Sequence, residues 1–181
     1  MKNKIYILLA LLTVFACKKE QKVDKEITLP FFNSAVFTPE WISETSSNYE
    51  KTHTIPAFKF TNQDGKSITN KTYKDKIYVA DFFFTSCPGI CPRLAKNMGK
   101  LQEIFKDDDE VMFLSHSVTP EQDSVTVLKE YGIKNNVNSK KWNLVTGDKT
   151  EIYNIAREGY FADEDFVKTQ DEDAFIHTEN R

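Results

Sequence analysis

The sequence has few of the residues on which several common protein classes depend. It contains three cysteines and three histidines among 181 residues, too few cysteines for a disulfide scaffold. Its formal net charge is -3, so it lacks the excess of basic residues typical of nucleic-acid binding, and we expect no nucleic-acid partner. No apolar run reaches the ~20 residues that a membrane-spanning helix needs. What remains, 40% hydrophobic and 28% charged residues, is the composition of one globular domain.

The first 17 residues have the pattern of a targeting segment. Lys2 and Lys4 form a basic start, and Ile5–Ala16 is an apolar run that ends in V-F-A-C at Cys17. A small residue directly before a cysteine, at the point where the apolar run stops, is typical of a bacterial lipoprotein signal. We therefore expect residues 1–17 to be a signal peptide with a lipid-modified Cys17, which would anchor the protein to a bacterial membrane on its periplasmic side. The alternative is an ordinary secretory signal.

The next residues, 18–52, are expected to form a tether and an arm ahead of the domain at 53–181. Lys18–Glu26 is charged and poor in apolar residues, which favours a flexible tether. Leu29–Trp41 is rich in aromatic residues, whose large apolar surface is not needed in a flexible tether. We expect this arm to pack against its own domain or a partner.

The segment Ile77–Pro92, which reads I-Y-V-A-D-F-F-F-T-S-C-P-G-I-C-P, organises the domain. Its first half has the β-branched and aromatic composition of a strand buried on both faces. It leads into Cys87 and Cys91, and Pro92 is suited to the first position of a helix. A buried strand that delivers two cysteines to a helix start is the layout of the thioredoxin-like fold. The dipole of that helix would stabilise a thiolate there.

Further strands and helices are expected on both sides of this segment. A hairpin should precede it, and three helices separated by two strands should follow. This order of elements indicates an α/β three-layer domain. The second helix is expected to begin at Thr119 as N-cap and to end at Gly132. The other expected elements are strands at Ile55–Phe60, from Ile68, at Val111–Val118 and at Lys141–Val145, and a helix at Asp148–Ala156.

Two cysteines separated by three residues allow two kinds of chemistry. They can cycle between dithiol and disulfide, because this spacing permits the ~4–7 Å Cα separation of a disulfide. They can also offer two thiolates to a soft metal such as Cu(I). A pair of inert thiols is disfavoured because prolines and Gly89 keep the pair out of regular structure. A thiol peroxidase would need Thr or Ser three positions before its cysteine, where this chain has Phe84.

A metal site needs a third ligand, and the sequence offers three histidines. We expect His53, in a polar linker, to be solvated, and His116, in a buried strand, to be hydrogen-bonded rather than a ligand. His177 follows the acidic run Asp163–Asp173 in a predicted loop, where it could be a ligand or a solvated side chain. The residues alone leave this choice open.

Four motifs in order, F-F-F-T-S-C-P-G-I-C-P, S-V-T-P-E-Q-D-S, W-N-L-V-T-G and F-I-H-T, closely resemble the Sco/SenC/PrrC family. Members of that family are membrane-anchored, thioredoxin-like copper carriers that help to assemble the copper site of cytochrome c oxidase subunit II. The resemblance runs from about Ile55 to Thr178 and implies that Cys87, Cys91 and His177 bind one copper ion, Cu(I) or Cu(II).

The chain departs from the family pattern at two places. Many members have Asp-Pro where this chain has Thr119-Pro120, although Asp123 matches the later acid of the same segment. In the family a β-hairpin and a helix follow the histidine loop, whereas this sequence stops at Arg181. We therefore expect a thioredoxin-like three-layer α/β/α domain that is incomplete at its C-terminus.

The resemblance favours a copper chaperone, a binding protein rather than an enzyme, that would pass copper to cytochrome c oxidase subunit II or another copper-site protein. The main alternative is a thiol-disulfide oxidoreductase that uses Cys87 and Cys91 as its redox pair and needs no histidine. A copper or redox sensor would look the same in the sequence.

Overall fold

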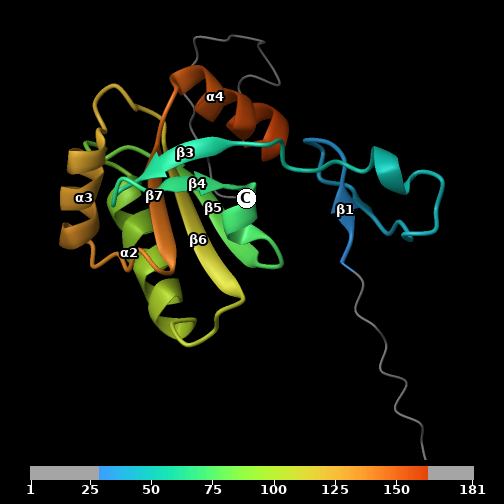
Figure 1. Ribbon diagram of the computed structural model, residues 1–181, viewed down its shortest axis with the longest axis horizontal. Helices are drawn as coiled ribbons and strands as arrows, with labels where there is room; N and C mark the ends of the chain where they lie inside the picture. Colours follow the sequence, from blue (N-terminus) through green and yellow to red (C-terminus); the bar gives the residue numbers. More distant parts are fainter. Residues whose placement is uncertain (1–28, 163–181) are drawn as a thin grey trace, which may run out of the picture. The chain divides into compact units, whose positions relative to one another are not determined.

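The computed structural model describes residues 29–162, and five of its strands form one sheet (Figure 1). The strand order across the sheet is β4-β3-β7-β6-β5. The last three strands in that order run parallel to one another, while β3 is antiparallel to both β4 and β7. The strands are β3 (Lys59–Asn62), β4 (Ser67–Thr69), β5 (Ile77–Phe83), β6 (Val111–Ser117) and β7 (Trp142–Thr146).

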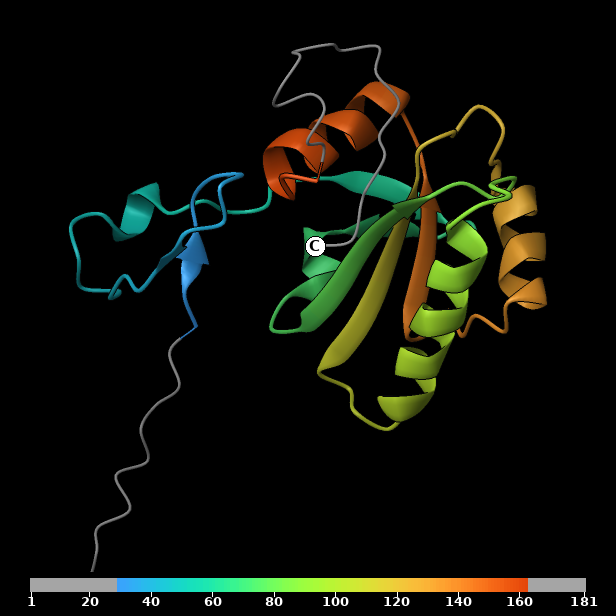
Figure 2. The same ribbon diagram turned by 180° about the vertical axis from the view of Figure 1, so that it is seen from behind.

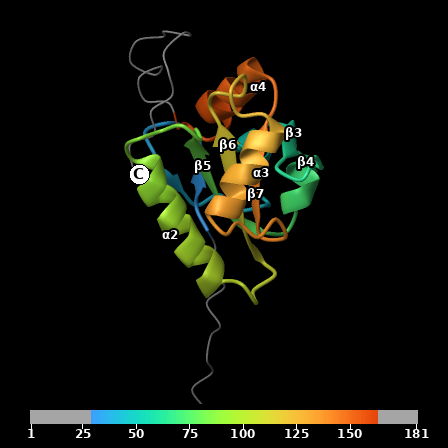
Figure 3. The same ribbon diagram turned by 90° about the vertical axis from the view of Figure 1, so that its left-hand side faces the viewer.

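Helices lie on both sides of this sheet, which confirms the predicted α/β three-layer arrangement (Figures 1 and 3). The α2 face is the side covered by α2 (Cys91–Ile104) and α3 (Val125–Lys134), and the α4 face is the side covered by α4 (Lys149–Asn154). A π-helical turn, η3 (Ile155–Gly159), continues α4. The shorter elements are β1 (Phe31–Phe32), β2 (Pro39–Glu40) and the 3-10 turns η1 (Tyr49–Lys51) and η2 (Asn70–Tyr73).

The alternation of side chains along the strands produces the two apolar faces of the sheet. Successive side chains on a strand point to opposite sides of the sheet, so a continuous apolar run supplies two cores. Phe83 packs on the α2 face with Met98 of α2, whereas its neighbour Phe82 packs on the α4 face with Ile152 of α4. The pairs Phe113 and Leu114 on β6, and Leu144 and Val145 on β7, divide in the same way.

The parallel register sets the position of the cysteine loop. β5 pairs with β6 so that Asp81 lies opposite Ser115 and Phe83 opposite Ser117. Because parallel strands end at the same edge of a sheet, the loop from β5 to α2 meets the loop from β6 to α3. Figure 2 shows both loops at this end of the sheet.

The second predicted helix begins later than expected. Thr119 is not its N-cap, because the carbonyl oxygen of Thr119 accepts the backbone N–H groups of Gln122 and Asp123 and closes a separate turn. α3 begins at Val125, after Ser124, whose hydroxyl group accepts the Val127 N–H. The helix also continues past Gly132 to Lys134. The turn ahead of α3 is what aims Asp123 at the cysteine loop.

The aromatic arm contacts the domain through few side chains. Asn33 accepts the His53 N–H at 2.7 Å, and Phe37 meets Phe161 edge to face at 6.2 Å between ring centroids. Val36 and Trp41 nevertheless remain 81% and 66% exposed. The predicted packing is therefore partial in the described residues. None of the helices between residues 29 and 162 is long and apolar enough to cross a membrane.

Candidate metal centre

The cysteine pair lies where β5 gives way to α2. Thr85 and Ser86 form a turn after the strand, and the Cys87 N–H donates to the carbonyl oxygen of Phe84 at 3.3 Å. Cys91 is the first residue of α2 and Pro92 the second, so the helix begins one residue earlier than the sequence predicted. The loop between the two cysteines is exposed. The site is thus open to an approaching ion or protein from one side.

The two thiols are free and differ in their surroundings. Cys87 is half-buried, whereas Cys91 is 6% exposed. Burial tends to raise the pKa of the Cys87 thiol, but hydrogen bonds from the Cys91 thiol and from the backbone of Cys91, Gly89 and Ile90 outweigh it and leave that pKa lowered. Burial raises the pKa of Cys91 well above its ordinary value, against a backbone hydrogen bond from Phe84. Cys87 is therefore the thiol that loses its proton more readily, and Cys91 is the thiol that holds its proton more tightly.

A small cavity lies behind Cys91 on the α2 face. It measures about 10 Å³, room for a single water molecule, and is lined by Asp81, Ser115, Tyr131 and Trp142 among others. The Trp142 indole donates to the Ser115 hydroxyl at 2.8 Å, and that hydroxyl donates to the Asp81 carboxyl group. Burial of this carboxyl group raises the pKa of Asp81 to about 7. The buried thiol thus adjoins a connected polar chain.

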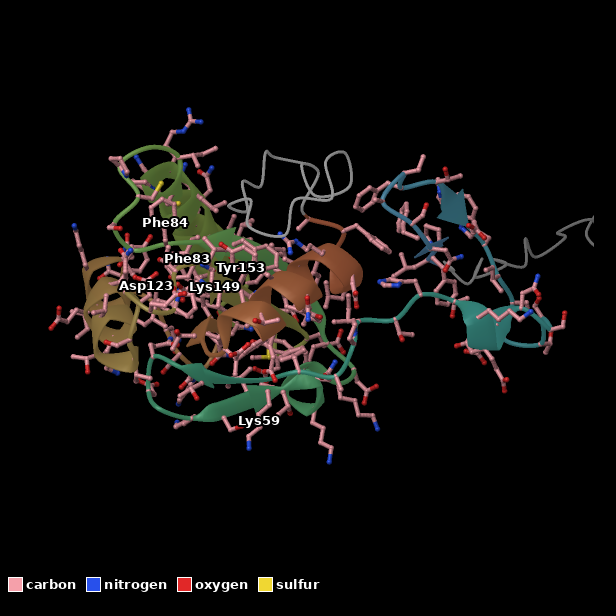
Figure 4. All side chains as sticks on the ribbon, turned by 90° about the horizontal axis from the view of Figure 1, so that it is seen from above. Lys59, Phe83, Phe84, Asp123, Lys149 and Tyr153 are labelled. Atoms are coloured by element: carbon pink, nitrogen blue, oxygen red, sulfur yellow. The ribbon has the colours of Figure 1, made fainter. Side chains whose placement is uncertain are left out.

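A second carboxylate, Asp123, connects the cysteine loop to the loop that follows β6. It accepts hydrogen bonds from the backbone N–H and the hydroxyl of Thr85, at 3.2 and 2.5 Å. It also accepts the hydroxyls of Ser117 and Thr119, at 2.5 and 3.1 Å. Figure 4 shows Asp123 beside the segment of Phe83 and Phe84. This carboxylate has four donors around it and is 1% exposed.

Two of the three predicted copper ligands lie within the described residues, and they lie together. His177 and the predicted lipidation site Cys17 fall outside residues 29–162. Inside that range no three side chains of His, Cys, Asp or Glu gather into a possible metal site. The described geometry therefore supplies two soft sulfur ligands, which fit copper, and leaves the third ligand as a prediction.

The other two histidines differ from what the sequence predicted. His53 is only partly solvated. Its Nε2 atom lies 2.9 Å from the carbonyl oxygen of Gly159, and its ring is tilted against Phe161 with 4.4 Å between centroids. His116 is completely buried, and neither ring nitrogen makes a hydrogen bond of good geometry in the described residues. Burial lowers the pKa of His116 to about 4, although a backbone group of Asp81 weakly favours the charged form. The sequence therefore predicted the location of His116 correctly but its hydrogen bonding wrongly.

Sequence reasoning missed the supporting residues. An acid inside the buried strand I-Y-V-A-D-F-F-F was a usable signal for Asp81, since a carboxylate is rarely buried without a role or a partner. Thr85 carried no such signal, because its contact with Asp123 joins residues 38 positions apart. Only the folded sheet brings them together.

Comparison with known proteins agrees with this geometry. Residues 46–181 match the model of the SCO1/SenC family. The SCO1 protein homologue of Bacillus subtilis is 34% identical over 132 residues, which cover 72% of this chain and 65% of that protein. The chain thus spans slightly less than two thirds of the length of this curated relative.

Solved structures give the same result. BsSco, described as a Sco-family cytochrome c oxidase assembly protein with a disulfide switch, is 33% identical with a TM-score of 0.56, over 61% of this chain and 65% of that one. A SCO1/SenC family lipoprotein from Bacillus anthracis is 36% identical with a TM-score of 0.55, over 65% and 68% of the two chains. ScoI of Bradyrhizobium japonicum, solved with copper bound, is 28% identical with a TM-score of 0.52, over 58% and 66%.

These likenesses confirm the predicted thioredoxin-like α/β fold. The family model covers most of the chain, including the cysteine loop that the structure describes. The chain belongs to the SCO1/SenC family.

Proposed function

We propose that this protein is a copper chaperone that binds one copper ion through Cys87, Cys91 and His177 and delivers it to the copper site of cytochrome c oxidase subunit II. The observation that carries the proposal is the pair of free thiols in unequal surroundings at the start of α2. A copper-bound structure of a family member and the description of the family as cytochrome c oxidase assembly proteins support it.

The three proposed ligands have different roles in binding the copper ion. The Cys87 thiol is accessible and its pKa is lowered, so it makes the first contact with copper. Cys91 releases its proton as its sulfur joins the same ion, because metal ligation requires the thiolate. His177 supplies an imidazole, which suits either Cu(I) or Cu(II). The ion leaves as thiolates of the partner replace these ligands one at a time, in the reverse order of binding.

Membrane attachment is part of the proposal. The V-F-A-C sequence at Cys17 supports a lipid anchor, and a relative from Bacillus anthracis is described as a lipoprotein. A chaperone held on the periplasmic side of the membrane would be confined to the surface on which a membrane-bound oxidase presents its copper site.

A thiol-disulfide oxidoreductase is the second candidate. The same pKa split between Cys87 and Cys91 supports it, since an accessible thiolate attacks a disulfide and a buried thiol resolves the mixed disulfide. The disulfide switch described for BsSco points the same way. In this reaction two electrons pass from the dithiol to the partner's disulfide, and His177 has no part.

Cu(I) binding to the reduced protein, in competition with a Cu(I) chelator, separates the two candidates. The variants are Cys87→Ser and His177→Ala, with Trp41→Phe as a control that alters an exposed arm residue. A chaperone should bind one copper per chain and lose affinity in both variants but not in the control. Disulfide reduction that survives His177→Ala, without copper binding by the wild type, would instead establish the oxidoreductase.

A further inference from the structure

Asp123 contacts the cysteine loop and the loop that follows β6 at the same time. Its Oδ1 atom accepts the Thr85 hydroxyl, and its Oδ2 atom accepts the Thr85 N–H together with the hydroxyls of Ser117 and Thr119. Thr85 stands two residues before Cys87, whereas Ser117 ends β6. One side chain therefore joins two loops that start from neighbouring parallel strands.

The environment of Asp123 makes this junction rigid. A buried carboxylate costs several kcal/mol of solvation unless hydrogen bonds replace the lost water. Asp123 is 1% exposed and has four such bonds, three of them from hydroxyl groups. Hydrogen bonds to a charged acceptor are roughly twice as strong as neutral ones. Displacing Thr85 would break two of the four bonds at once.

The two cysteines depend on this junction unequally. Cys91 is buried in the first turn of α2 and packs with Ala95 and Met98, so the helix and the core hold it. Cys87 lies in the loop, where its backbone bonds only to Phe84 among the described backbone contacts outside helices and strands. Hydrogen bonds to the Cys87 sulfur hold this residue from the Cys91 end of the loop. The backbone of Phe84 and Thr85 holds it from the other end, and that end depends on the Asp123 junction.

We infer that Asp123 is the positioning residue for Cys87: by fixing Thr85, it holds the Cys87 sulfur within reach of the Cys91 sulfur. The inference rests on the proposed function in that both chemistries, copper binding and disulfide exchange, need the two sulfurs together. Asp123 acts through Thr85 and does not itself touch the metal. It is a different residue from the acid that the family places at position 119, where this chain has threonine.

The test is the equilibrium between the metal-free protein and glutathione. The protein dithiol and one glutathione disulfide give the protein disulfide and two glutathione thiols, so two electrons and two protons move from Cys87 and Cys91 to glutathione. The equilibrium constant, read from the alkylated fraction by mass, reports how well the two sulfurs are held together. Asp123→Ala and Thr85→Val should each lower it by about tenfold, the scale of loss when a supporting residue is removed.

Two matched variants decide whether the effect is specific. Asp123→Asn should restore most of the constant, because its amide oxygen can replace Oδ2 while its NH2 group donates to the Thr85 hydroxyl. Ile152→Ala destabilises the α4 face, away from the loop, and should leave the constant unchanged. An equal loss in Ile152→Ala, or no loss in a folded Thr85→Val, would overturn the inference.

Cu(I) affinity provides the second measurement and should fall in the same order across these variants. If the wild type binds no Cu(I), the copper proposal fails, while the glutathione equilibrium still decides the role of Asp123. If Asp123→Ala does not fold, Thr85→Val alone carries the test, because it removes one hydroxyl and keeps the buried carboxylate.

Discussion

The two faces of the sheet bury polar groups in contrasting ways. On the α2 face, Trp142, Ser115 and Asp81 form a connected chain of hydrogen bonds that ends at the cavity beside Cys91. On the α4 face, His116 is enclosed by aromatic rings and makes no hydrogen bond of good geometry among the described residues. Those rings belong to Phe58, Phe60, Phe82 and Tyr160, with centroids 4.9–6.4 Å from the imidazole.

Ser115 and His116 are neighbours on β6 and both are buried. Neither their place in the sequence nor their degree of burial therefore explains why only Ser115 is hydrogen-bonded. The contrast teaches that burial alone does not decide whether a polar side chain has a partner, since Ser115 is hydrogen-bonded whereas His116 is buried without one at a cost in stability. The two faces also respond to pH in opposite directions, because burial raises the pKa of Asp81 and lowers that of His116. Each of the following substitutions tests one side of this comparison.

Cys91→Ser should have the largest effect. It removes a sulfur that the proposed function assigns to copper, so Cu(I) affinity should fall by more than the roughly 10–100-fold loss typical of residues that only support a ligand. The measurement is competition with a Cu(I) chelator. His116→Phe is the matched control on the α4 face and should bind copper like the wild type. An equal loss in both variants would mean that the faces are not functionally distinct.

His116→Phe should stabilise the protein by about 1–3 kcal/mol at pH 7.5, because it removes two unsatisfied ring nitrogens from an aromatic cluster. The folded state resists protonating His116, so the wild type also loses stability, relative to its value above pH 6.5, as pH falls toward about 4. That loss amounts to roughly 3 kcal/mol. Urea unfolding at several pH values measures both effects.

His116→Leu separates the effect of removing the ring nitrogens from the effect of keeping a flat ring in the same place. It should remove the same pH dependence, but it should be less stable than His116→Phe because leucine does not replace the flat ring against Phe82. Retention of the wild-type pH dependence in either variant would contradict the assignment to His116.

Asp81→Asn should show the opposite pH dependence. The folded state holds a proton on Asp81 up to about pH 7, so its contribution is favourable at acid pH and is lost as pH rises from about 4 through 7. The variant should therefore be more stable than the wild type at pH 8, by about 1–2 kcal/mol after allowance for the partial exposure of the residue. Urea unfolding of the metal-free protein at pH 5 and pH 8 checks this. A wild-type advantage at pH 8 would show that the carboxylate is charged and stabilising.

Tyr78→Phe should have the smallest effect. The hydroxyls of Tyr78 and Tyr160 lie 3.0 Å apart on the α4 face, and removing one should cost about 1 kcal/mol. The same unfolding experiment measures it, with no change expected in its pH dependence below pH 8. A cost as large as that of a core deletion would show that this face depends on its polar contacts after all.

The sequence was sufficient for the parts of the molecule that depend on local pattern. The apolar segment before Cys87 predicted β5, and Pro92 predicted the start of α2 to within one residue. The prediction that this strand is buried on both faces was wrong, because β5 is the edge strand of the sheet and Ile77 and Val79 are 64% and 39% exposed. Fold class followed from the order of elements. The Sco/SenC resemblance predicted the family to which the chain belongs.

Sequence reasoning could not provide what depends on contacts between distant residues. Thr119 looked like an N-cap because proline and glutamate follow it, yet the turn it closes serves Asp123 instead. His116 looked like any strand histidine, and only the register opposite Phe82 reveals its aromatic surroundings. Ligation by His177 and lipidation at Cys17 remain predictions, since both residues lie outside the described range.

The pairing of β3 with β7 has a consequence for how the chain reaches its folded state. The β3–β4 hairpin pairs close neighbours in sequence, but the sheet closes only when Thr61 meets Thr146. Long-range pairing of this kind forms late and slowly. Throughout that interval Cys87 and Cys91 belong to a nascent chain with neither the cavity nor the Asp123 junction. Until the folded site has formed, the thiols of such a chain would depend on external reductants and on the exclusion of other metal ions for their protection.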